Sequence, residues 1–196
     1  NDICDVKQDR RHPRKKITRP LAANQLSLST AKIVLFVLYA LLFLSLFIEQ
    51  KAAIVVFSYL VLNICYSYYL KHQPVLDLFS IAVGFVLRVY AGSVILTVPL
   101  SGWMFVTTLS LAIFLAASKR ATELNISPVF ETRKVLQSYT PEMMRAFCII
   151  SATASLMFYC FFALTQSPAL LYTIPLVMFG IFRYWFLVET LHKSES

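Results

Sequence analysis

The sequence predicts an all-α protein that crosses a membrane several times. Hydrophobic residues make up 58% of the 196-residue chain and charged residues only 14%, a balance that is typical of membrane proteins. Apolar runs long enough to cross a bilayer, roughly 17–25 residues each, occur six times. We therefore expect residues 1–196 to form one polytopic helix bundle.

The six expected spans are apolar and nearly free of charge, and most connections between them are a few residues long. Short connections make sequential helices antiparallel neighbours. Two segments, 1–27 and 119–145, are long and polar. In the second, Lys119–Glu123 continue the preceding span as helix, and Thr140-Pro141 is typical of a helix N-cap followed by proline. The expected spans lie near 28–48, 52–70, 75–97, 102–118, 146–165 and 168–190.

The distribution of Lys and Arg predicts the orientation. Segments 1–27, 71–74, 119–145 and 191–196 share one side and hold seven, one, five and one of the 18 Lys and Arg residues, whereas the opposite loops hold only Lys51. By the positive-inside rule the basic segments are cytoplasmic, in a multi-pass protein of the inner or plasma membrane. The net charge of +8 then reflects topology, and we expect no nucleic acid as partner.

Three carboxylates stand at the start of the chain. Asp2, Asp5 and Asp9 are spaced three and four residues apart, which places them on one face of a helix. Crowded carboxylates repel one another unless a cation sits between them, and hard oxygen ligands suit Mg²⁺. A basic run from Arg10 to Arg19 follows at once. Together they suit a polyphosphate, although a solvated loop is the alternative.

Two charged residues fall inside one expected span. Asp77 lies near one end, and Arg88 lies eleven residues further on, about 16 Å deeper on the same helix face. Intramembrane charges are costly and usually face a cavity or a partner; a purely structural bridge is the alternative. Gly84 and Gly92, four residues either side of Arg88, predict a small face for close helix packing.

Several site types are not expected. The four cysteines show no paired spacing, so neither a zinc site nor a disulfide framework is indicated. Only four glycines occur, and none of them forms a glycine-rich nucleotide loop. Any phosphate group must therefore be held by metal and by cationic side chains.

The motifs, in the order in which they occur along the chain, resemble those of the UbiA superfamily of intramembrane prenyltransferases. Within that superfamily they are most similar to the decaprenyl-phosphate phosphoribosyltransferase branch. The resemblance covers nearly the whole chain. It rests on Asn1-Asp2-x-x-Asp5-x-x-x-Asp9-Arg10-x-His12-Pro13, Arg19-Pro20-Leu21-Ala22-Ala23, Tyr66-Ser67, Leu70-Lys71, Asp77, Gly84-Phe85-x-Leu87-Arg88-x-x-Ala91-Gly92, Lys119-Arg120-x-x-Glu123-Leu124 and Phe182-Arg183-Tyr184.

The resemblance implies a helical bundle in which segments 1–27 and 119–145 cap an active-site cavity. Asp2, Asp5 and Asp9 become Mg²⁺ ligands, with Asn1 beside them. Prenyl-transferring members carry an aspartate pair in the second loop, whereas this chain has Lys119-Arg120-x-x-Glu123; that departure favours the phosphoribosyl branch. A full member has about nine spans, so we expect this chain to be part of a longer one.

The predicted function is Mg²⁺-dependent transfer of a 5-phosphoribosyl group from phosphoribosyl pyrophosphate to a polyprenyl phosphate. Asp2, Asp5, Asp9, Lys71 and Arg88 are the predicted catalytic residues. Lys71 and Arg88, with Lys119 and Arg120, are the candidates for holding phosphates. The predicted substrate-binding residues are Asn1, Arg10, Tyr66, Asp77, Lys119, Arg120 and Glu123.

Three alternatives remain open at this point. One is a prenyltransferase that moves an isoprenoid from its diphosphate to an aromatic acceptor. Another is a transporter that uses Arg88 and Asp77 as an intramembrane path, and the last is an inactive fragment. An oligomer is possible under each of them.

Overall fold

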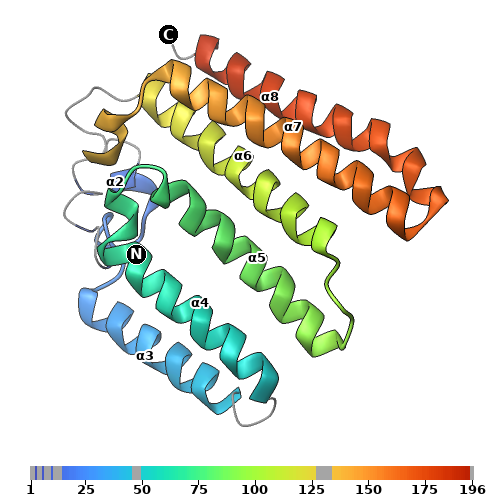
Figure 1. The fold of residues 1–196 in the computed structure, drawn as a ribbon. Coiled ribbons are helices and arrows are strands. Elements are labelled where there is room, and N and C mark those ends of the chain that lie inside the picture. The colour runs from blue at the N-terminus through green and yellow to red at the C-terminus, as the bar shows by residue number, and fades with distance from the viewer. Residues whose placement is uncertain are drawn as a thin grey trace. The chain divides into compact units, whose positions relative to one another are not determined.

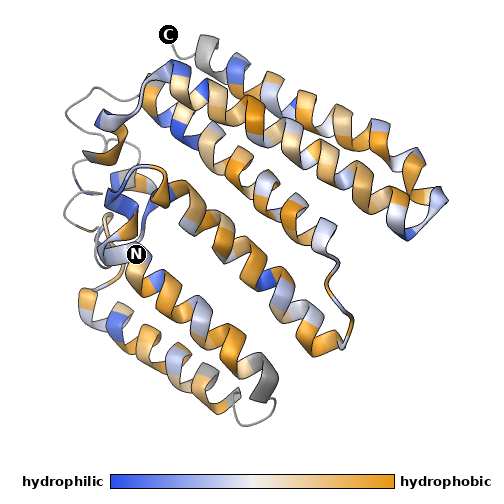
Figure 2. Cartoon of the chain, viewed as in Figure 1, coloured by the Kyte–Doolittle hydropathy of each residue, from blue (hydrophilic) through white to orange (hydrophobic). Residues whose placement is uncertain are grey.

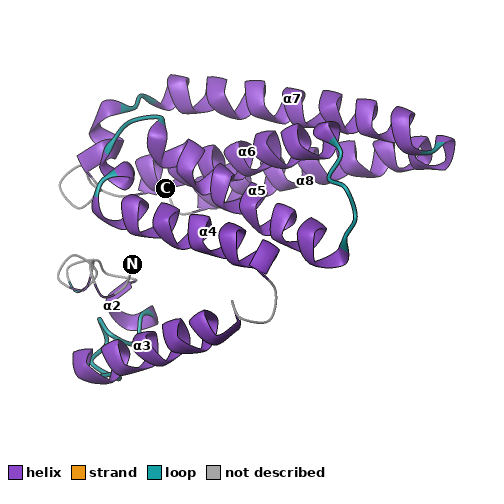
Figure 3. Ribbon diagram, turned by 60° about the horizontal axis from the view of Figure 1, so that its bottom comes forward, coloured by secondary structure: helices purple, strands orange, loops and turns teal. Residues whose placement is uncertain are grey.

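The computed structural model describes residues Ile3, Val6, Arg10, 15–45, 50–126 and 134–194. Over these residues the chain is helical and contains no strand, as Figures 1 and 3 show. The chain divides into two compact units, Asn1–Phe57 and Ser58–Ser196.

The first unit contains a short helix α2 (Lys15–Thr18), the apolar helix α3 (Leu28–Ser45) and the start of α4 (Gln50–Tyr68). Ser27 precedes α3, and its hydroxyl accepts a hydrogen bond from the N–H of Thr30 at 3.1 Å. This is the contact that an N-cap serine makes. Ser27 therefore marks the start of α3, the helix that contains the first expected span.

The second unit continues from the middle of α4. Helix α6 lies beside both α5 and α7, and α8 packs on α6 and α7 (Figure 1). The elements that follow α4 are η1 (Leu70–His72), α5 (Leu76–Leu96), α6 (Gly102–Ile126), η2 (Lys134–Ser138), α7 (Pro141–Gln166), η3 (Pro168–Thr173) and α8 (Ile174–Ser194).

The membrane-protein prediction agrees with the helices. Four segments are long and apolar enough to cross a bilayer: Leu76–Leu96, Gly102–Leu124, Pro141–Gln166 and Pro168–Thr190. The first two expected spans are also helical, with shorter apolar stretches Leu28–Ala40 and Ala53–Tyr68 within the described residues. Figure 2 shows hydrophobic residues on several sides of these helices, the pattern of helices that face lipid or other helices.

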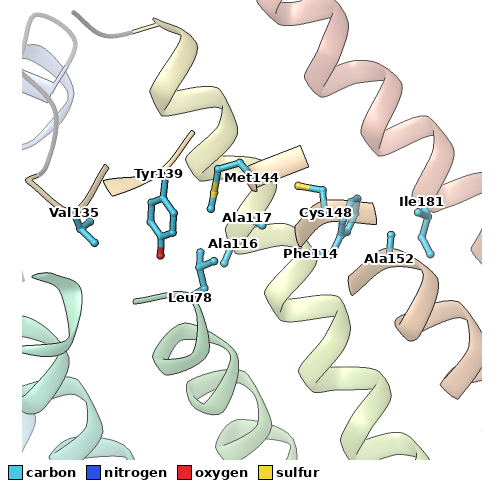
Figure 4. Packing of buried hydrophobic residues seen from close by; sticks show 10 residues of the cluster. All are labelled: Leu78, Phe114, Ala116, Ala117, Val135, Tyr139, Met144, Cys148, Ala152 and Ile181. Atoms are coloured by element: carbon cyan, nitrogen blue, oxygen red, sulfur yellow. The ribbon is translucent and has the colours of Figure 1, made fainter. Parts of the chain in front are cut away.

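The core of the second unit lies where α5, α6, α7 and α8 meet. Phe114 and Leu78 are each 1% exposed, and Met144 is fully buried. Alanines 116 and 117 of α6 join the same cluster and let neighbouring helices approach closely. Figure 4 shows Leu78, Ala116 and Met144 close together and Ile181 of α8 pointing toward Ala152 of α7.

Two local predictions can be compared with the structure. Thr140 is the N-cap of α7; its hydroxyl accepts a hydrogen bond from the N–H of Met143 at 3.2 Å, and Pro141 follows, as predicted. A Cβ added to Gly84 would lie 3.6 Å from the Tyr59 ring on α4, which is close packing. A Cβ on Gly92 would meet no described atom within 4 Å, so only Gly84 lies on the predicted small face.

Candidate active site

A buried ion pair joins α5 to α6 at the end of the helices where η1 and η2 lie. Asp77, in the first turn of α5, is fully buried, and Arg120 of α6 is 3% exposed. The Arg120 Nε–H donates to Asp77 Oδ2 at 3.2 Å. Burying either charge alone would be costly, so the pair depends on mutual neutralisation and further hydrogen bonds.

Tyr139 supplies one of those hydrogen bonds. Its hydroxyl donates to Asp77 Oδ1 at 2.7 Å and accepts the N–H of Val75. Val75 has φ 66°, a left-handed conformation that is unfavourable for a β-branched residue. Burial of the phenol raises the pKa of Tyr139 to about 12, and the adjacent Asp77 carboxylate acts in the same direction. The phenol is therefore a neutral donor at physiological pH.

The remaining guanidinium nitrogens of Arg120 also have partners. One Nη donates to Glu123 Oε2 at 2.8 Å and the other to the Tyr66 hydroxyl at 3.4 Å. We call this group of side chains the Asp77 cluster. It connects α4, α5 and α6 to the residue just before the N-cap of α7. Its members are Tyr66, Asp77, Arg120, Glu123 and Tyr139. Such a cluster holds the end of α6 in a fixed position relative to α5.

Two predicted phosphate-binding lysines flank the Asp77 cluster in sequence. Lys71 lies in η1 and is 7% exposed, and η1 packs against both α5 and η2. Lys119 precedes Arg120 on α6, but its side chain is exposed. Because adjacent helical residues point about 100° apart, Arg120 turns inward to Asp77 while Lys119 turns to the surface.

Arg88 lies apart from the Asp77 cluster. Its guanidinium donates to the Tyr59 hydroxyl of α4 and lies 5.1 Å from the Tyr59 ring centroid and 4.9 Å from that of Phe85. Cation–π contacts of this kind stabilise an arginine away from water. Arg88 therefore contacts two aromatic rings, one on α4 and one on its own helix, and its predicted role in the reaction stays a prediction.

The predicted metal ligands Asp2, Asp5 and Asp9, and Asn1 beside them, lie outside the described residues. Carboxylates in this number are a donor set that Mg²⁺ prefers. Elsewhere, among residues that are described, no group of three or more His, Cys, Asp and Glu side chains could hold a metal. Arg10 is described: its guanidinium donates to Asn24 Oδ1 at 2.7 Å, and its N–H donates to the Val6 carbonyl at 3.1 Å.

Tyr139 was not predicted from the sequence. It stands just before Thr140-Pro141, in a loop where a lone tyrosine carries no motif. The one sequence signal near Tyr139 was the Thr140-Pro141 N-cap. A defined start for α7 also holds the backbone of the preceding residue, Tyr139, in place. Its pairing with Asp77 spans 62 positions of the chain, which no local pattern reports.

The model of the UbiA prenyltransferase family matches residues 1–196. The chain belongs to the UbiA prenyltransferase family. This agrees with the all-α membrane bundle and with the resemblance that the motifs indicated.

Curated relatives within the UbiA family include decaprenyl-phosphate phosphoribosyltransferases. The chain is 36% identical over 172 residues to that of Mycolicibacterium smegmatis, a match covering 86% of this chain and 54% of the relative. It is 36% identical over 164 residues to the relative from Corynebacterium glutamicum, a match that covers 81% of this chain and 49% of the relative. It is 33% identical over 162 residues to the relative from Mycobacterium tuberculosis, a match that covers 81% of this chain and 53% of the relative. The chain thus spans about half the length of these relatives.

Proposed function

We propose that this UbiA family protein transfers a 5-phosphoribosyl group from phosphoribosyl pyrophosphate to a polyprenyl phosphate. In the reaction, the bond between C1 of the ribose and the pyrophosphate oxygen breaks, and pyrophosphate leaves with the electron pair. An oxygen of the lipid phosphate supplies the pair for the new bond to C1. The nucleophile is already an anion, so no general base is required.

The observation that carries the proposal is the exposed Lys119 at the end of α6. Prenyl transfer from a diphosphate in this family uses acidic residues in the second loop, whereas here Glu123 is paired with Arg120 at 2.8 Å. A donor with an additional 5-phosphate needs an exposed cation such as Lys119. The names of the relatives, each a decaprenyl-phosphate phosphoribosyltransferase, support the same donor and acceptor.

The proposed roles follow from burial and partners. Arg120 is already engaged by Asp77 and Glu123, so we assign it to positioning the end of α6. Lys119 is exposed and suits an incoming phosphate group. Lys71, on the adjacent η1 segment, is the second candidate for phosphate binding. Preorganised positive charge of this kind is the usual main contribution to catalysis when anionic charge develops on a leaving group.

The first-loop carboxylates would hold Mg²⁺. Asp2 and Asp5, with Asp9, provide oxygen ligands of the required type. The ion would supply charge neutralisation and orientation for the departing pyrophosphate. Arg10, whose guanidinium is exposed and bonded to Asn24, lies directly after these carboxylates in the chain and suits an outer oxygen of the same pyrophosphate.

The proposal is tested with membranes that contain the protein, polyprenyl phosphate and radiolabelled phosphoribosyl pyrophosphate. A parallel reaction supplies labelled prenyl diphosphate and an aromatic acceptor. We expect label to enter the lipid extract only in the first reaction and only with divalent metal. Labelled aromatic product in the second reaction, with none in the first, would replace the proposal with aromatic prenylation.

A further inference from the structure

Two cavities meet at one side chain where α7 and α8 pack together. The first, which we call the head cavity, measures about 210 Å³ and lies at the start of α7 and the end of α8. The second, the chain groove, measures about 270 Å³ and runs between the apolar faces of the same two helices. Trp185 of α8 lines both, so the two cavities adjoin at its indole.

The chain groove follows one face of each helix. On α7 its lining residues Ile149, Thr153 and Leu156 recur every three or four positions, and on α8 Met178 and Phe182 do the same. From Ile149 to Leu156 the groove extends about 10 Å along α7. One leaflet of a bilayer is about 15 Å deep. The groove therefore suits a hydrocarbon chain anchored in a single leaflet.

The head cavity is charged and lies apart from the Asp77 cluster. Its α6 lining residues, Ser118 and Ala121, lie on the side of the helix opposite Arg120 and Glu123, because each residue turns the direction by about 100°. Arg120 is committed to Asp77 on the other side. The head cavity thus lies on the face of α6 opposite the Asp77 cluster.

The charges of the head cavity indicate its ligand. Among the residues whose side chains are described, Glu142 of α7, Glu189 of α8 and one cation, Arg145, line it. The Glu189 carboxylate accepts a hydrogen bond from the Trp185 indole at 3.3 Å, which orients it at the point where the cavity and groove meet. Two carboxylates with one guanidinium complement a ligand that carries both an ammonium and a phosphate group. They disfavour a head that is only anionic, such as a lipid phosphate monoester.

We propose that α7 and α8 form a binding site for a zwitterionic aminophospholipid. The ammonium is held by Glu142 and Glu189, the phosphate by Arg145, and one hydrocarbon chain lies in the groove below Trp185. The phosphatidylethanolamine head fits this set best, because its ammonium retains N–H donors for the two carboxylates. This site goes beyond the proposed transfer reaction and does not depend on it.

Native mass spectrometry of the detergent-purified protein tests the site. The protein is titrated with phosphatidylethanolamine, phosphatidylcholine or phosphatidylglycerol. We expect phosphatidylethanolamine to be retained roughly tenfold better than phosphatidylcholine or phosphatidylglycerol, since only it offers N–H donors to carboxylates. The double variant Glu142→Gln/Glu189→Gln should lose this preference. Equal retention of the three phospholipids would overturn the proposal.

A second pair of variants tests the chain groove with the head cavity left intact. Thr153 lines the groove and is exposed, so Thr153→Trp fills the groove without entering the core. Ile150 is 65% exposed and is not among the groove's lining residues, so Ile150→Trp adds the same indole on the same helix. Thr153→Trp should reduce phosphatidylethanolamine retention about tenfold, and Ile150→Trp should not. If the two variants behave alike, the groove does not hold the chain.

Discussion

Replacing Tyr139 by phenylalanine should destabilise the protein, because the hydroxyl connects the second polar segment to α5. The change removes the donor to the fully buried Asp77 carboxylate and the acceptor for the Val75 N–H. The aromatic ring, which packs edge-on against Phe147 with centroids 6.5 Å apart, is retained. Any loss can therefore be attributed to the hydroxyl.

The size of the loss follows from the two hydrogen bonds. A hydrogen bond to a charged group contributes about 1.5–3 kcal/mol, and one between neutral groups about 0.5–1.5 kcal/mol. Val75 is 40% exposed, so water can partly replace the second bond. We expect Tyr139→Phe to lower the free energy of unfolding by about 2–4 kcal/mol.

The free energy of unfolding can be measured by titrating mixed micelles with a denaturing detergent. Tyr172→Phe is the matched control, because Tyr172 is 85% exposed and its hydroxyl should contribute no more than about 0.5 kcal/mol. A double-mutant cycle with Asp77→Asn should give a coupling within the range of about 0.5–3 kcal/mol. If Tyr139→Phe cost no more than the control, Tyr139 would not hold the Asp77 cluster together.

Four further predictions follow from the same structure. Because the pKa of Tyr139 is raised, the Tyr139 hydroxyl stabilises the fold fully below about pH 10, and this stabilisation is lost as the pH rises through about 12. The tyrosinate absorbance that disappears in Tyr139→Phe should therefore titrate near pH 12. A midpoint near pH 10 would contradict this. Asp2→Asn and Asp5→Asn should abolish metal-dependent transfer in membrane assays while leaving the thermal melting of the protein unchanged; full activity in either variant would refute the metal assignment. Arg88→Leu removes the contacts with Tyr59 and Phe85, and this loss offsets the cost of about 2.5–3.5 kcal/mol for a charge at membrane depth, so stability should change little. The catalytic role predicted for Arg88 from the sequence requires that transfer fall at least tenfold; wild-type transfer would make Arg88 a structural residue. Thr140→Ala should cost about 1 kcal/mol of unfolding free energy through loss of the α7 N-cap, whereas Thr140→Ser should cost little, and equal losses would argue against capping.

The helices could be predicted because membrane-spanning segments are long, apolar and joined by short connections. Polar residues continue two helices beyond their apolar parts, and the sequence predicted both extensions, from Lys119–Glu123 and from the Thr140-Pro141 cap. Helix α6 extends to Ile126 and α7 begins at Pro141, whereas the apolar runs end near 118 and begin near 146. The last expected span, 168–190, starts as the 3₁₀ segment η3, with Pro168 first and Pro175 near the start of α8.

The site could be predicted only in part. The sequence picked out Asp77, Arg120 and Glu123 as substrate-binding residues, which stays a prediction, but pattern alone did not reveal that these charges pair with one another. The Asp77–Arg120 pair joins residues 43 positions apart. Arg88 was expected to face a cavity or a partner, but its contact with Tyr59 depends on how α4 and α5 pack. The roles of Asn1, Asp2, Asp5 and Asp9 stay predictions.

Position-specific labelling of the donor tests the central claim most directly. Phosphoribosyl pyrophosphate labelled in the ribose ring and, separately, at the β-phosphate is supplied with polyprenyl phosphate to membranes containing the protein. Phosphoribosyl transfer predicts that ring label enters the lipid while an equal amount of β-phosphate label appears in water as pyrophosphate. β-Phosphate label in the lipid, or neither label in it, would contradict breakage of the C1–oxygen bond at this site.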